Sequence, residues 1–177
     1  MEPDPFPCAS MVIFRPTLGL AVKMRIKTAA TNHQSDTRLG DWYAKDVTLG
    51  KRRLVLCVSD LSRLAVVLDA APHASIPERL PPAVGALLER IGPPREAIER
   101  EVAAMQTISI AKTNSRSVLG SLNEYEWMLR CRCESEPPAG PADLLMMSLW
   151  LSDTVTSALP DLSPGVAAMR LLSGQNQ

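Results

Sequence analysis

The chain has 177 residues, of which 46% are hydrophobic and 21% are charged, and its 19 lysines and arginines balance 19 aspartates and glutamates. This composition excludes collagen, a coiled coil and a wholly disordered chain. The length predicts one domain that buries a sizeable core without disulfide or metal staples. No stretch approaches the roughly 18 uncharged apolar residues of a membrane span, so we expect no membrane partner.

The N-terminus and the cysteines favour a cytoplasmic protein. Residues 1–10 contain acidic residues and three prolines, where a signal peptide has a basic and then an apolar run. We expect these residues to form a disordered tail, with Met1 or Met11 as the true start. Four cysteines are too few for a disulfide scaffold, and no CxxC spacing predicts a metal site. We therefore expect no metal and no cofactor.

Positive charge is concentrated towards the front of the chain. Between Arg15 and Arg63 there are ten lysines and arginines against four aspartates and glutamates, a net charge of +6, so the remainder carries −6. A basic segment of this kind can face nucleic acid or another polyanion. It is more often a solvated strand surface, and both interpretations stay open.

The first half of the chain predicts a strand, a basic amphipathic helix, a mobile loop and a three-stranded meander. The apolar face of the helix carries Leu18, Val22 and Ile26. Gly50-Lys51 has glycine first, which predicts a two-residue hairpin turn of type II′. In chain order the expected ranges are strand 11–15, helix 17–27, loop 28–40, and strands 41–49, 52–59 and 63–69.

The second half predicts helices and one further strand. Ser121 and Glu124 form an S-x-x-E capping box, which predicts that a helix begins at about Leu122. The expected ranges are loop 70–82, helices 84–91 and 98–105, half-buried strand 106–111, helix 122–133, proline linker 137–141, helix 142–157 and a last helix from Ser163-Pro164. Together these elements predict a single α+β domain over 11–177, in which helices cover one face of a mainly antiparallel sheet of about five strands.

The best candidate site is the connection between the half-buried strand and the capped helix. Strand-to-helix turns gather free backbone N–H groups, and the helix dipole adds partial positive charge, so an anion such as phosphate would suit this connection. The alternative is a turn whose polar side chains satisfy the backbone, with Arg116 paired to an acid. The candidate ligand-binding residues here are Lys112, Thr113, Asn114, Arg116, Ser117 and Ser121.

Two further features suggest chemistry. Lys51, Arg52 and Arg53 form a basic hairpin tip that can touch phosphates or can simply protect a sheet edge, and Trp42 begins the same hairpin beside Tyr43. A nuclease-like cluster of hairpin carboxylates is the enzymatic alternative; it would combine Asp41, Asp46 and Asp60 with Lys45. The two histidines, His33 and His73, both lie in expected loops, and nothing pairs either of them with a nucleophile.

Three segments resemble an uncharacterised bacterial family. Its members carry W-H-A-N, an R-[RK] hairpin strand and T-x-x-R-S-[VI]-[LI]-G-S-M-N-[DE], which correspond here to the segments 42–45, 52–53 and 113–124. An L-[NS]-[DE]-T motif appears at 151–154, and related segments are similar to the front part of some plasmid and mobile-element proteins. The family is a domain of unknown function, so the resemblance implies no catalytic residue. Tyr43 and Lys45 stand where members usually have His and Asn, so any role of that histidine is absent here.

These observations predict a cytoplasmic, non-enzymatic binding or regulatory protein, associated with mobile elements or defence. Its expected ligand is a phosphate-bearing molecule, a nucleic acid or the acidic segment of a partner protein. A small hydrolase or nuclease that uses the hairpin carboxylates is the alternative, and a structural subunit without a ligand is the third interpretation. The sequence does not predict the oligomeric state.

Overall fold

The computed structural model describes residues 10–134, 138–159 and 162–174. The tail expected over 1–10 lies outside the described residues except for Ser10, and so does the first residue of the expected proline linker. Within the described part of the chain, no helix is both long enough and apolar enough to cross a bilayer.

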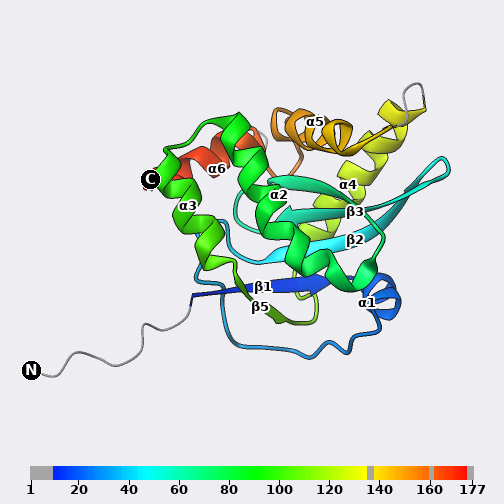
Figure 1. Cartoon of the computed structure of the whole chain (residues 1–177), viewed down its shortest axis with the longest axis horizontal. Coiled ribbons are helices and arrows are strands. Elements are labelled where there is room, and N and C mark those ends of the chain that lie inside the picture. Colours follow the sequence, from blue (N-terminus) through cyan, green and yellow to red (C-terminus); the bar gives the residue numbers. More distant parts are fainter. Residues whose placement is uncertain (1–9, 135–137, 160–161, 175–177) are drawn as a thin grey trace, which may run out of the picture.

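The described residues form one five-stranded sheet in the order β4-β3-β2-β1-β5 (Figure 1). β2, β3 and β4 make the predicted antiparallel meander, whereas β1 pairs in parallel with both β2 and β5. The predicted α+β class and the five strands are confirmed, but the sheet is mixed, because connections that contain helices join strands of the same direction. The strands are β1 (Met11–Pro16), β2 (Trp42–Leu49), β3 (Arg52–Ser59), β4 (Ala65–Asp69) and β5 (Thr107–Ile110).

The hairpin between β2 and β3 has the predicted register. Leu49 pairs with Arg52, which leaves Gly50-Lys51 as the two-residue turn. Gly50 has φ +60°, a conformation that glycine adopts without the steric cost of a side chain. The prediction of a glycine-first hairpin turn is therefore confirmed.

Six α-helices and one short 3-10 helix occur in the described ranges. α2 begins within the expected loop 70–82 and includes Pro81 and Pro82. α5 ends five residues before the expected position, whereas α6 begins as predicted, with the Ser163 side chain accepting from the Val166 N–H. The bounds are α1 (Leu18–Met24), η1 (His73–Ser75), α2 (Ile76–Ile91), α3 (Arg95–Ala104), α4 (Arg116–Cys133), α5 (Pro141–Ser152) and α6 (Pro164–Leu172).

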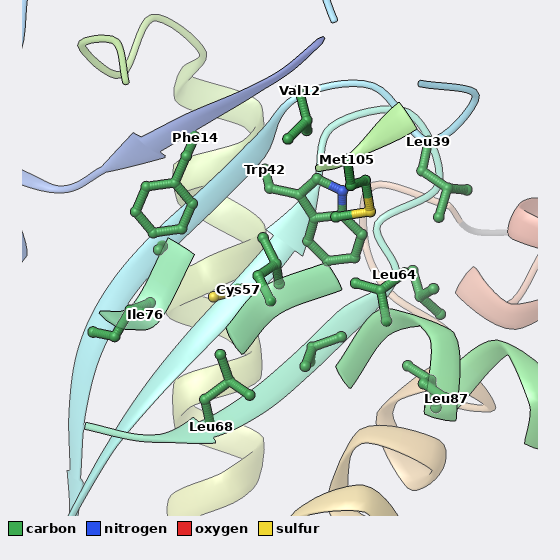
Figure 2. Packing of buried hydrophobic residues seen from close by; sticks show 14 of the residues in the cluster. Val12, Phe14, Leu39, Trp42, Cys57, Leu64, Leu68, Ile76, Leu87 and Met105 are labelled. Atoms are coloured by element: carbon green, nitrogen blue, oxygen red, sulfur yellow. The ribbon is translucent and has the colours of Figure 1, made fainter. Parts of the chain in front are cut away.

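Helices cover both faces of the sheet, not the single face that the sequence predicted. Alternate residues of a strand point to opposite faces, and residues 54–58 of β3 and 65–68 of β4 are apolar and buried on both. On one face Trp42 and Cys57 pack with α1, α2, α3 and α6 into a first core (Figure 2). On the other face Tyr43 and Leu56 pack with α4 and α5 into a second core. Both helix layers are needed because each face of the meander has apolar side chains that must be buried away from water.

α1 buries a different face from the one that the sequence predicted. Leu20, Ala21 and Met24 are buried, while Leu18 and Val22 are 79% and 69% exposed. The helix also ends at Met24 and not at residue 27, because Arg25 adopts the left-handed conformation with φ +58°. The expected apolar stripe of this helix is therefore mostly a solvent-facing surface.

Candidate functional site

The connection between β5 and α4 lies beside the start of the hairpin. We call residues 111–117 the junction. Its backbone is held from three sides: the Ala111 N–H donates to the Phe14 carbonyl at 3.0 Å, the Lys112 N–H donates to the Ala29 carbonyl at 2.8 Å, and the Arg15 guanidinium donates to the Lys112 carbonyl. Together, β1 and the expected mobile loop thus fix the path of the junction.

α4 begins six residues earlier than the capping box predicted. Ser115 is the N-cap, and its side-chain oxygen accepts from the Val118 N–H at 3.3 Å. Ser121 lies inside the helix, where it is buried and its hydroxyl donates to the Ser117 carbonyl, and Glu124 accepts from Ser157 instead of capping. The predicted capping box is therefore wrong, and Ser121 has almost no surface through which to contact a ligand.

The other predicted junction residues do face the solvent to different degrees. Thr113 is half-buried, whereas four residues of the first turn of α4 and the preceding loop are exposed. The exposed members are Lys112, Asn114, Arg116 and Ser117. The structure thus brings five of the six predicted junction residues together at an accessible place.

A polar cavity of about 480 Å³ opens next to the junction, and we call it the site pocket. The end of β1, the loop before β2, the turn after β3 and the junction all contribute to its wall. Its main polar residues are Arg15, His33, Asp41, Tyr43, Asp60 and Asn114. These residues are far apart in the sequence, so only the fold assembles them.

A buried ion pair forms one wall of the site pocket. Arg15 Nε lies 2.5 Å from Asp41 Oδ2, and the two side chains are only 3% and 11% exposed. The second oxygen of Asp41 accepts from the hydroxyl of Ser35 at 2.7 Å and from its N–H at 3.3 Å. The guanidinium of Arg15 also lies 5.9 Å from the centre of the Tyr43 ring, and the Tyr43 hydroxyl donates to Asn114. These contacts connect β1, β2, the loop and the junction into one polar cluster.

Asp60 is a carboxyl of the site pocket whose pKa is shifted. Its Oδ1 accepts from the Asp41 N–H at 3.0 Å. Burial, and then the nearby charge of Asp41, raises the pKa of the Asp60 carboxyl to about 6. Gly40 makes this approach feasible, because it has φ +78° and a Cβ at this position would lie 2.0 Å from Asp60 Oδ1. A carboxyl with this pKa changes its charge within the physiological range.

Arg63 joins the turn after β3 to the first turn of α4. One guanidinium nitrogen donates to the Ser117 hydroxyl at 3.0 Å, and another donates to the Asp60 carbonyl at 2.6 Å. The Tyr125 hydroxyl donates to the carbonyl of Arg63 at 2.9 Å. A third cation, after Lys112 and Arg116, therefore lies at the start of the helix.

The predicted hairpin residues do not reach this site. Arg52 and Arg53 lie at the tip of the hairpin, whereas the Tyr43 end of β2 contacts the junction. Arg52 pairs with Asp69 at 2.9 Å, and Arg53 is 54% exposed. Trp42 is completely buried in the first core, on the sheet face opposite Tyr43, and so has no exposed surface to offer a ligand (Figure 2).

The hypothesised cluster of three carboxylates is wrong. Asp41 and Asp60 do meet, but Asp46 lies on the other face of the sheet, where it contacts Lys23 and His73. Among the described residues, no group of three histidines, cysteines, aspartates or glutamates is placed to hold a metal ion. Lys45 points towards α4, and its ammonium donates to Asn123 at 2.7 Å and pairs with Glu126.

Sequence reasoning missed two arginines of the site, Arg15 and Arg63. A charged residue at the end of the apolar run MVIFR was the available signal for Arg15, since a cation in a buried strand needs a partner. Arg63 gave no such signal, because it lies at the edge of an expected turn.

The fold and the site together define an α+β domain with a polar pocket at the junction between β5 and α4. The model of the family described as a domain of unknown function (DUF6933) matches residues 13–163, which include every residue of the site pocket. The chain belongs to this family. No curated protein and no solved structure gives a significant match. The predicted resemblance is thus confirmed for a family of unknown function, while the similarity to plasmid and mobile-element proteins stays a prediction.

Proposed function

We propose that this protein is a non-enzymatic binding protein, with a regulatory role, whose ligand carries a phosphate group. The ligand places that group on the junction and extends into the site pocket. One observation carries the proposal: a rigidly held loop leaves Lys112 and Arg116 exposed at the start of an eighteen-residue helix, directly beside an open polar cavity.

The electrostatics of the junction suit an anion. The first N–H groups of a helix have no acceptor inside the helix, and Ser115 satisfies only that of Val118. The helix dipole adds partial positive charge at this end, and three cationic side chains surround it. Oxygen atoms of a phosphate accept well from such N–H and guanidinium groups.

The geometry favours binding over hydrolysis, the alternative function. A general base needs a carboxylate oxygen that is available to a water molecule. Both oxygens of Asp41 already accept, one from Arg15 and the other from Ser35. Asp41 therefore acts as a structural anchor, and Asp60 is left without a second catalytic carboxylate.

The test is a titration of the full chain and of the double variant Lys112→Ala with Arg116→Ala. Inorganic phosphate, ATP and a short single-stranded DNA are the probes, and heat release is measured at low and moderate salt. Arg95→Ala with Arg100→Ala is the matched control, since it removes two exposed cations on α3, which packs against α2 and α6. We expect binding that weakens with salt, is retained in the control and is lost in the junction variant. Absence of binding to the wild type, or equal binding by both variants, would contradict the proposal.

A further inference from the structure

The outer face of α1 combines apolar and basic side chains. Leu18 and Val22 are one helical turn apart and lie 79% and 69% exposed. They are the only two large exposed hydrophobic residues of the described chain that share a helix face at this spacing. The opposite face of α1 is fixed in the first core through Leu20 and Met24. The exposed pair is therefore part of a rigid surface and not of a loose segment.

Cations surround this apolar pair. Arg25 and Lys27 follow the helix directly and are exposed, and no carboxylate of the described residues pairs with either of them. Lys23 and Arg53 share a single carboxylate, that of Asp46. We call Leu18, Val22, Lys23, Arg25 and Lys27 the α1 patch.

Arg25 is held at a defined place. It has φ +58°, a left-handed conformation that usually favours glycine, and its N–H bonds to the Val22 carbonyl at 3.1 Å. The next N–H, that of Ile26, bonds to the Ala21 carbonyl at 3.1 Å. These two bonds fix the chain as it leaves the helix, so the arginine side chain starts from a fixed position beside Val22. Figure 1 shows α1 at the edge of the molecule, where a partner can reach it.

We propose that the α1 patch docks an acidic amphipathic segment of a partner protein. The apolar side chains of that segment cover Leu18 and Val22, and its carboxylates pair with Arg25 and Lys27. The charge of the patch selects an anionic occupant, and the exposed aliphatic side chains select one that also has an apolar face. This proposal is independent of the phosphate-binding junction.

The composition of the α1 patch distinguishes this occupant from two other anionic ones. Nucleic acid contacts come mainly from cations, hydroxyl groups and stacked aromatic rings, and the patch has two aliphatic side chains and no aromatic ring. Helices that lie on a lipid surface have a long apolar face, commonly with tryptophan or phenylalanine. α1 has only seven residues and two exposed apolar side chains.

The probe is a fluorescein-labelled amphipathic peptide made of leucine and glutamate, compared with one in which serine replaces leucine and one in which lysine replaces glutamate. Fluorescence anisotropy measures binding to the full chain, to Leu18→Ser with Val22→Ser, and to Arg25→Glu with Lys27→Glu. Val155→Ser with Val166→Ser is the matched control, because those side chains are 60% and 44% exposed on other segments. Melting temperatures within a few degrees of the wild type show that each variant is folded.

We expect the leucine–glutamate peptide to bind the wild type and the control equally, and both patch variants to bind at least tenfold more weakly. The serine and lysine peptides are expected to bind weakly to every protein. The proposal is wrong if the first peptide does not bind, or if the control loses as much affinity as the patch variants. It is also overturned if a DNA duplex, or vesicles of phosphatidylserine and phosphatidylcholine, bind through the same residues more tightly than the peptide does.

Discussion

Replacing Arg15 with methionine tests the polar cluster that supports the site. Methionine has a similar length and no charge, so Arg15→Met leaves the Asp41 carboxylate, of which only 11% is exposed, without its cation. It also removes the donor to the Lys112 carbonyl. Breaking a buried ion pair by removing one partner costs about 3–5 kcal/mol, and we expect a loss of stability in this range. A domain of this size has only about 5–15 kcal/mol in total.

Urea unfolding of the wild type and three variants measures this effect. The double variant Arg15→Met with Asp41→Asn removes both charges and is expected to recover at least about 1 kcal/mol relative to Arg15→Met alone. Arg95→Met is the control, because Arg95 is 90% exposed and its loss should change stability by no more than about 0.5 kcal/mol. A loss below about 1 kcal/mol in Arg15→Met, or no recovery in the double variant, would refute the assigned coupling.

Three further predictions concern backbone geometry and pH. Gly50→Val should lower the free energy of unfolding by more than about 1 kcal/mol, because a β-branched residue tolerates φ +60° poorly, and a neutral result in urea would contradict the hairpin turn. Gly40→Ala should be at least as damaging, since its Cβ meets Asp60, and the additional change Asp60→Gly should restore part of the stability measured by thermal melting. The pKa of Asp60 is raised from 3.8 to about 6, so its stabilising contribution is complete below pH 4 and is lost as the pH rises through 6. Asp60→Asn should therefore flatten the pH dependence of stability between pH 4 and 6, and an unchanged slope would show that Asp60 titrates normally.

The parts of the fold that depend on local pattern were predictable. Gly50-Lys51 fixes the hairpin, and the apolar run after Arg53 identifies a strand that is buried on both faces. Where two local patterns compete, the sequence does not decide between them. Ser115 and Ser121 are both typical helix caps, and tertiary contacts favour the earlier one, because Arg15 and Tyr43 hold the residues just before it.

The face of α1 and the site pocket were beyond prediction for the same physical reason. α1 has two interleaved sets of apolar residues, and only packing against the sheet determines that Leu20 and Met24 are buried and Leu18 is not. The site pocket brings together residues from four separate segments, so no spacing along the chain indicates it. The exposed part of the junction was predictable because strand, turn, cations and helix are consecutive in the sequence.

Titration of the ¹⁵N-labelled chain with inorganic phosphate, followed by amide chemical shifts, tests the central claim most directly. If the junction binds the phosphate group, the largest and saturable shifts will be those of the amides of Ser115, Arg116 and Ser117, at the start of α4. The same shifts will be absent in the variant Lys112→Ala with Arg116→Ala. Shifts confined to the hairpin tip at residues 50–53, or no saturable shift anywhere, would contradict the assignment of the junction as the binding site.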